Sequence, residues 1–222
     1  MKDALPAHLA GCLALAAGLA FAEGPAQPAG AAPADARAVL VRVQRAYASA
    51  PSFTANFVQT YAPAGFAPAA PETGRVTLQA PDRVRFEYDG PEGKLFAFDG
   101  KAARQYVAAD RQMIVKTLPA SDRERLPLLF FESAETVLAR YEALAADGEN
   151  GLADVSLTPR SGGDPAQIVL AVAPTGEVKR LVVTDGAGNR TTFTFSQKTA
   201  GARRPLSDFA PKPPPGTKVI SE

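Results

Sequence analysis

The stretch "APDRVRFEYDGPEGKLFAFDGK", residues 80–101, decides the fold. Apolar and charged residues alternate in its first half, which places Val84, Phe86 and Tyr88 on one face of a strand and charged side chains on the other. The segment "KLFAF" then supplies a second apolar strand. The breaks "APD", "DGPEG" and "DGK" are turn sequences, because Pro presets φ and Gly or Asp tolerates positive φ. Together these features predict an antiparallel meander with one apolar face.

Similar strands flank this stretch on both sides. The first run also includes "FTANFVQTY" at 53–61, "RVTLQ" at 75–79, "ARQYVA" at 103–108 and "RQMIVKTL" at 111–118. A second run consists of "LADVSLTP" at 152–159, "AQIVLAVAP" at 166–174, "EVKRLVVTD" at 177–185, "NRTTFTFSQ" at 189–197 and a short apolar segment near the C-terminus. The chain is therefore predicted to be mainly β, of the α+β class, with about 11 strands in one large antiparallel sheet.

Two segments have helical periodicity instead. Asp35 is a good N-cap, and the apolar residues Val39, Val43 and Tyr47 follow it on one helix face. Pro51 closes this helix. The segment 121–141 is the second, with Ser133 as an N-cap inside it. The helices are thus available to cover one face of the sheet.

The small volume of these helices must cover a large apolar sheet surface. A sheet that curves strongly around the helices makes this possible. Two interpretations remain open from the residues alone. In the first, the apolar faces form an ordinary packed core. In the second, the covering helices are partly displaceable, and the sheet holds an apolar ligand beneath them.

Composition excludes several kinds of chemistry. The net charge of +1 gives no indication of a nucleic-acid partner. The only histidine is His8 and the only cysteine is Cys12, so removal of the N-terminal segment leaves no thiol or imidazole. Thiol nucleophiles, Ser-His-Asp triads and His or Cys metal sites are then excluded. We expect no enzyme activity, no catalytic residue, no metal and no cofactor; the alternative is a hydrolase that uses two carboxylates, such as Glu87 and Asp99.

The N-terminus resembles a secretory signal. Residues 1–22 contain Lys2, an apolar run at 9–21 and the small-x-small site Ala20-Phe21-Ala22, which predicts cleavage near Ala22. Residues 23–33 are rich in Pro, Ala and Gly and are predicted to be a flexible segment. Residues 34–222 are predicted to form a single domain.

The tetrad Leu9-Ala10-Gly11-Cys12 offers a second interpretation, because bacterial lipoproteins are cut and lipidated at such a cysteine. Two features disfavour it. Only eleven residues precede Cys12, and they include Asp3, Pro6 and His8, which leaves little apolar segment before the site. An apolar run follows Cys12, whereas a lipidated N-terminus is followed by a polar tether. The sequence therefore favours a chain released into the periplasm over one anchored through Cys12.

Several segments resemble the periplasmic lipoprotein carrier (LolA) family. The resemblance covers roughly residues 36–222, in order. It rests on the Phe-x-x-x-Phe-x-Gln pattern at Phe53, Phe57 and Gln59, on the block that contains Pro81, Arg85-Phe86, Tyr88, Pro91 and Asp99-Gly100-Lys101, on "YVAADRQMIV" at 106–115, on "GNRTTFTFS" at 188–196, and on "PPGTKVI" at 214–220.

The resemblance implies an unclosed antiparallel β half-barrel whose concave apolar face is covered by helices. It implies a monomeric periplasmic carrier that takes acylated lipoproteins from an inner-membrane ABC lipoprotein-releasing complex and delivers them to an outer-membrane lipoprotein receptor. The alternatives on the same fold are that receptor itself, which needs a lipidated Cys12, and an envelope-stress sensor domain. Such sensors usually carry an additional domain, for which this chain has no room.

A carrier of this kind needs an apolar cavity for acyl chains. From strand alternation and the helical segment we predict that eight residues line or plug it: Phe57, Val84, Phe86, Tyr88, Phe96, Met113, Phe131 and Leu138. The sequence departs from the family at Ala80, where members often carry a basic residue thought to latch the covering helices. That role is therefore not assigned to any residue.

Overall fold

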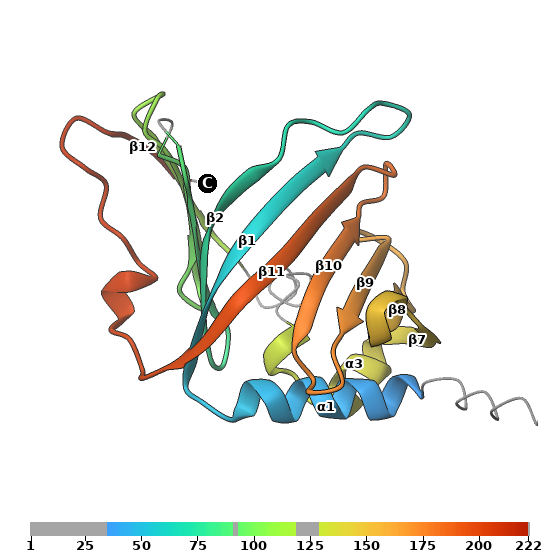
Figure 1. Ribbon diagram of the computed structural model, residues 1–222. Helices are drawn as coiled ribbons and strands as arrows, with labels where there is room; N and C mark the ends of the chain where they lie inside the picture. The colour runs from blue at the N-terminus through green and yellow to red at the C-terminus, as the bar shows by residue number, and fades with distance from the viewer. Residues whose placement is uncertain (1–34, 91–92, 119–128, 222) are drawn as a thin grey trace, which may run out of the picture. The chain divides into compact units, whose positions relative to one another are not determined.

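A computed structural model describes residues 35–90, 93–118 and 129–221 (Figure 1). The chain divides into two units, Met1–Ala32 and Pro33–Glu222, and the second is described here. The predicted signal peptide, residues 1–22, and the predicted flexible segment, residues 23–33, lie outside the described residues.

The elements follow the predicted order of a helix, a first run of strands, a short helical region and a second run of strands. The first part contains α1 (Ala36–Ala48), β1 (Ser52–Ala62), β2 (Glu72–Gln79), β3 (Arg83–Tyr88), β4 (Leu95–Phe98), β5 (Ala102–Val107) and β6 (Gln112–Thr117). The second part contains η1 (Leu129–Phe131), α3 (Ala134–Arg140), β7 (Tyr141–Asp147), η2 (Glu149–Gly151), β8 (Ala153–Pro159), β9 (Gln167–Val172), β10 (Val178–Thr184), β11 (Arg190–Gly201), η3 (Leu206–Asp208) and β12 (Lys218–Ser221).

One twelve-stranded sheet joins all the described strands, in the order β12-β6-β5-β4-β3-β2-β1-β11-β10-β9-β8-β7. Neighbours are antiparallel except β12 and β6, which pair in parallel. The sheet is strongly bent, and its two edge strands, β12 and β7, are not joined (Figure 1). The predicted open antiparallel half-barrel is confirmed.

The sheet has twelve strands where the sequence predicted about 11, and the additional strand is β7. Its sequence "YEALAAD" is rich in residues that favour helices, and the prediction placed its first residue, Tyr141, in the second helical segment. In the structure α3 ends at Arg140, and Tyr141 pairs with Pro159 at the start of a continuous ladder to β8. Pairing along a sheet edge thus overrides local helix propensity.

The two described α-helices are capped as the sequence predicted. Asp35 accepts a hydrogen bond from the amide of Arg37 at the start of α1, and Ser133 accepts one from the amide of Thr136 at the start of α3. One face of α1 is buried, including Val43. Figure 1 shows α1 across one end of the sheet, beside α3. None of the helices in the described ranges is long and apolar enough to span a bilayer.

Strand register defines two faces, because directly paired residues of antiparallel strands point to the same side. Phe57 on β1 pairs with Phe195 on one side and with Gly74 on the other, and Gly74 pairs with Tyr88. We call the side that carries Phe57, Tyr88 and Phe195 the inner face. It forms the main hydrophobic core together with buried residues of α1, η1 and α3.

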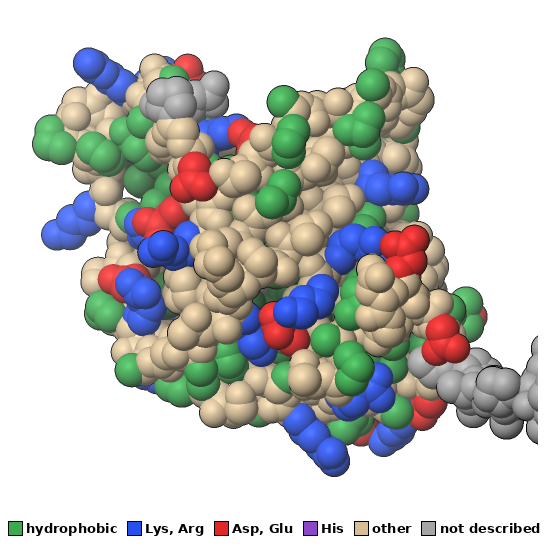
Figure 2. Space-filling model, viewed as in Figure 1, with side chains coloured by type: hydrophobic (Ala, Val, Ile, Leu, Met, Phe, Trp, Pro, Cys, Tyr) green, Lys and Arg blue, Asp and Glu red, His purple; other side chains and the backbone are tan. Residues whose placement is uncertain are grey.

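The opposite side, which we call the outer face, is largely polar over β1, β11 and β10. A row of paired residues there consists of Val58, Thr194 and Arg180. Figure 2 shows this side of the molecule, with acidic and basic side chains interspersed among other polar groups and backbone. The alternation read from the sequence therefore separates a solvated face from an apolar one.

Part of the outer face is covered by residues 202–217, the segment that leads from β11 to β12, which we call the strap. The fully buried amide of Gln79 accepts a hydrogen bond from the Arg204 amide at 2.6 Å and donates one to the Arg204 carbonyl at 3.3 Å. Arg85 donates to the Asp208 carbonyl at 2.7 Å. Phe209, which follows η3, is fully buried.

Candidate functional site: an apolar cavity on the inner face

The inner face encloses a cavity of about 260 Å³. It lies between β2, β3 and β4 on one side and β10, β11 and η1 on the other. Its lining consists of Val76, Leu78, Val84, Phe86, Tyr88, Phe96, Phe130, Leu181, Phe193 and Phe195. All of these side chains are hydrocarbons except that of Tyr88, which fits a site for an apolar ligand.

Aromatic rings form much of the cavity wall. Phe57 lies edge-on to Phe86 and to Tyr88, with centroid distances of 5.3 and 5.1 Å. Phe193 stacks on Phe195 at 6.1 Å and lies 5.3 Å from Phe86. These contacts connect β1, β3 and β11, so the wall brings together residues that are far apart in the sequence, such as Phe86 and Phe193.

Four of the eight predicted cavity residues line the cavity in the structure: Val84, Phe86, Tyr88 and Phe96. Phe57 is not in the lining, but it is buried and packs edge-on against Phe86 and Tyr88. Phe131 and Leu138 are half-buried and pack against the same hydrophobic core from the helical segment. The structure therefore brings seven of the eight residues to the inner face or its cover.

Met113 is the exception. It pairs with Tyr106, which pairs with Leu95, which pairs with Glu87, so its side chain belongs to the outer face. There it is almost fully buried. The face assignment from alternation was wrong for this residue, because a shift of one residue in the register between two strands exchanges the faces.

Six lining residues were not among the predicted set: Val76, Leu78, Phe130, Leu181, Phe193 and Phe195. A sequence signal did exist for two of them, because Phe193 and Phe195 alternate with threonines and share one face of a strand. Their place on the cavity depends on the pairing of β11 with β1, which joins residues more than a hundred positions apart. Local patterning does not contain that information.

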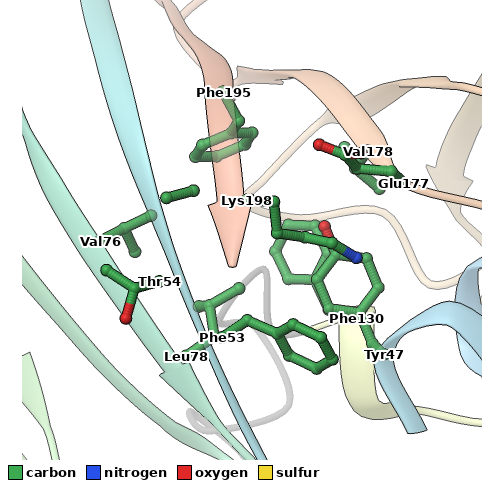
Figure 3. A pocket seen from close by; sticks show the side chains of 11 residues that line it. Tyr47, Phe53, Thr54, Val76, Leu78, Phe130, Glu177, Val178, Phe195 and Lys198 are labelled. Carbon is green, nitrogen blue, oxygen red and sulfur yellow. The ribbon is translucent and has the colours of Figure 1, made fainter. Parts of the chain in front are cut away.

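A smaller space of about 10 Å³ lies beside the cavity, toward α1, and shares Val76, Leu78, Phe130 and Phe195 with it. Figure 3 shows Lys198 reaching into this region beside the ring of Tyr47. The Lys198 ammonium lies 4.3 Å from the ring centroid of Tyr47 and 4.6 Å from that of Phe53. It thus contacts aromatic rings of both α1 and β1, as cations do with ring faces.

A β-bulge places Lys198 on the inner face. The register between β1 and β11 shifts between Thr54 and Asn56, and Gln197 has a φ of 52°. The extra residue in β11 re-aims the side chain that follows it. Burial lowers the pKa of Lys198, while the Glu177 carboxylate opposes that shift.

Polar groups lie at the end of the cavity that is farthest from α1. The Tyr88 hydroxyl donates a hydrogen bond to Oε1 of Gln59. Lys94 lies over the Tyr88 ring at 5.5 Å and forms an ion pair with Glu72. Burial, with a smaller effect of the Glu72 charge, raises the pKa of Tyr88 to about 12, so its hydroxyl is neutral at physiological pH.

The two carboxylates considered for a hydrolase, Glu87 and Asp99, are not part of the cavity lining. Glu87 lies on the outer face in an ion pair with Arg85 at 2.8 Å. Asp99 organises the turn before β5; burial raises its pKa, but hydrogen bonds from the Ala102 amide and from Arg104 outweigh this and lower the pKa below its ordinary value. Within the described ranges, no group of three or more His, Cys, Asp or Glu residues is placed to hold a metal ion.

The open sheet, its short helices and the apolar space between them define a half-barrel protein built around an internal hydrophobic cavity. The family model described as outer membrane lipoprotein carrier protein LolA matches residues 48–212, and the chain belongs to this family.

Named relatives cover most of the chain. It is similar to an outer-membrane lipoprotein carrier protein of Chromobacterium violaceum, with 26% identity over 191 residues that cover 86% of this chain and 91% of the relative. A protein of the same name from Azotobacter vinelandii is 26% identical over 208 residues, covering 94% and 97%. The fold is also similar to that of an uncharacterised conserved protein from Thermus thermophilus, with a TM-score of 0.52, 12% identity and coverage of 84% and 99%.

Proposed function

We propose that this protein is a periplasmic carrier that binds the acyl chains of lipoproteins in its inner-face cavity. The observation that carries the proposal is a cavity of about 260 Å³ with a lining of hydrocarbon side chains and one tyrosine. Membership of the lipoprotein carrier family supports it. Similarity to relatives named outer-membrane lipoprotein carrier proteins points to the same cargo.

The energetics of acyl chains explain why such a protein needs a cavity. Each buried CH₂ group contributes about 0.8 kcal/mol, so a diacylated protein does not cross water at a useful rate unaided. A carrier that buried both chains completely would have the same difficulty in releasing them to water. We therefore propose transfer directly from donor to carrier and from carrier to acceptor, with the chains never fully hydrated.

The size of the cavity suggests how the cover takes part. A cavity of about 150 Å³ accommodates one benzene molecule, so about 260 Å³ holds only a section of one acyl chain. Phe130, which lines the cavity, belongs to η1, and η1 packs against α1. We propose that cargo displaces this helical cover and enlarges the cavity, with the bound and unbound forms in exchange.

The proposed pathway runs from an inner-membrane ABC lipoprotein-releasing complex to an outer-membrane lipoprotein receptor. It requires export and cleavage near Ala22, after which the monomeric chain diffuses in the periplasm. The alternative, a receptor anchored through Cys12, predicts a different mature N-terminus. Mass spectrometry of the mature protein separates them: a free Glu23 supports the carrier, and an acylated Cys12 supports the receptor.

The carrier function is tested with detergent-free vesicles that contain a purified lipoprotein together with the inner-membrane ABC lipoprotein-releasing complex, supplied with ATP. The mature protein is added, the vesicles are removed by centrifugation, and the supernatant is analysed by gel filtration. We expect the lipoprotein to leave the vesicles and to co-elute with the carrier.

The matched control is the same lipoprotein with its acylated cysteine replaced by serine, so that it carries no acyl chain. It should not co-elute with the carrier. Co-elution of both forms would show recognition of the polypeptide rather than of the acyl chains, and co-elution of neither would contradict the proposed function.

A further inference from the structure

We propose that Tyr88 and Gln59 form a polar subsite in which the Gln59 amide, oriented by Tyr88, donates a hydrogen bond to the carbonyl oxygen of the ester or amide group that joins an acyl chain to its head group, and so fixes the direction of the chain in the cavity. This inference rests on the proposed function, because it assigns a position to one part of the same ligand. The carbonyl groups that this subsite would bind are those of neutral esters or amides.

The first observation is the chemistry of the wall. Among the ten described residues that line the cavity, Tyr88 is the only one whose side chain has a polar atom. Its hydroxyl is already oriented by the hydrogen bond to Oε1 of Gln59. That bond leaves the amide NH₂ of Gln59, with its two N–H donors, beside the hydroxyl oxygen. A carbonyl oxygen that reaches this end of the cavity therefore meets donors, whereas elsewhere the lining offers only hydrocarbon.

The second observation is the position of this pair along the cavity. The strand register orders the inner face in rows that run away from α1. Leu78 pairs with Val84 in the row nearest α1, and Val76 pairs with Phe86 in the next. Tyr88 stands in the third row, opposite Gly74.

Beyond that third row, Gln59 pairs with Glu72, and Glu72 holds Lys94 in an ion pair. Polarity thus begins at Tyr88 and increases away from α1. A chain whose head group lies at this end places its terminal methyl group toward Leu78 and Phe130.

The third observation concerns charge. Glu72 lies close enough to Tyr88 to raise the pKa of the hydroxyl further above its ordinary value, beyond the effect of burial. The same carboxylate repels an anionic head group, and its partner Lys94 is occupied by the ion pair and by the Tyr88 ring. The surroundings thus favour a neutral carbonyl, as in a glyceryl ester or an N-acyl amide.

The test compares two ligands of similar length that differ in the carbonyl group: methyl decanoate and dodecane. Each displaces a fluorescent naphthalene dye from the purified protein, and the midpoint of displacement gives the affinity. The variant Tyr88→Phe keeps the ring, its packing on Phe57 and its contact with Lys94, but removes the hydroxyl.

Without the Tyr88 hydroxyl the Gln59 amide is no longer oriented toward the carbonyl, and loss of that one neutral hydrogen bond to the ligand should weaken binding of methyl decanoate about three- to tenfold. Binding of dodecane should change by less than about twofold. Gln59→Leu, which removes the amide, should produce the same selective loss, and it provides a second variant should Tyr88→Phe fold poorly. The control Tyr106→Phe makes the same chemical change on the outer face, where Tyr106 pairs with Met113, and should affect neither ligand.

The outcomes are distinguishable. Equal weakening of both ligands, or of neither, in Tyr88→Phe and Gln59→Leu would overturn the subsite and leave the carrier function standing. A wild-type protein from which neither ligand displaces the dye would contradict the proposed function itself, and the subsite with it.

Discussion

Gly74 permits the aromatic packing on which the cavity depends. It stands between Phe57 on β1 and Tyr88 on β3 in the inner-face row. A Cβ atom at this position would lie 2.1 Å from the Glu87 carbonyl oxygen and 2.7 Å from Cζ of Phe57. The first neighbour is backbone, which cannot move without disturbing the ladder between β2 and β3. The absence of a side chain at Gly74 is therefore what allows the Phe57 ring to lie edge-on to Tyr88.

Gly74→Ala is accordingly expected to destabilise the protein by about 1–3 kcal/mol through overpacking. Denaturant unfolding measures the change. Gly186→Ala is the matched control, because nothing lies within 4 Å of its added Cβ, and its effect should be within about 0.5 kcal/mol. Equal stabilities for the two variants would refute the packing account.

Tyr88 also makes a prediction about alkaline pH. Its pKa is raised from 10.0 to about 12 in the folded protein. Above pH 10 the hydroxyl ionises in the unfolded chain first, which favours unfolding, so this contribution to stability is present below pH 10 and is lost as the pH rises toward about 12. Urea midpoints of Tyr88→Phe should therefore fall less steeply over this interval than those of the wild type. Parallel curves would show that Tyr88 is not the group responsible.

At the scale of elements, the strap on the outer face depends on one buried amide. Gln79 supplies both a donor and an acceptor to the backbone of Arg204. Gln79→Leu leaves these groups without partners and should cost about 1–3 kcal/mol. Amide hydrogen exchange should increase in residues 204–209, which Gln79 and Arg85 hold in place. Gln167→Leu, at an exposed position of β9, is the control and should leave the exchange of the strap unchanged.

The strands themselves could be predicted from the sequence because each has one apolar and one polar face. In β3, Val84 and Phe86 alternate with Arg85 and Glu87, and the turns on either side mark its ends. The strand β7 could not be predicted in this way. Its residues favour a helix locally, and only pairing with β8, which the sequence does not display, makes it a strand.

The site was less predictable than the fold because it depends on register. Met113 was assigned to the wrong face, since alternation within β6 does not show which of its residues lie on the same face as given residues of β4. Lys198 was not singled out, because the bulge that re-aims it forms only when β11 pairs with β1. Phe130 comes from η1, where strand periodicity does not apply. Long-range pairing therefore decides which of many apolar residues become cavity lining.

At the scale of the whole folded unit, the half-barrel combines a large apolar surface with a cover that leaves part of that surface free. A single bent sheet provides a continuous apolar inner face, and short helices cover part of it rather than filling it. The remaining space is small in the structure, which is consistent with a carrier that opens for its cargo and closes without it. A lining of hydrocarbon side chains and one tyrosine suits the containment of hydrocarbon.

The most direct test of this account is site-specific photo-crosslinking to lipoproteins in cells. A photoreactive phenylalanine analogue replaces Phe86 or Phe193 on the cavity wall, and Thr194, the neighbour of Phe193 on the outer face, is the control. The account predicts that the two cavity positions capture acylated lipoproteins and that position 194 does not. Capture at position 194 with none at Phe86 or Phe193 would contradict the claim that the inner face carries the acyl chains.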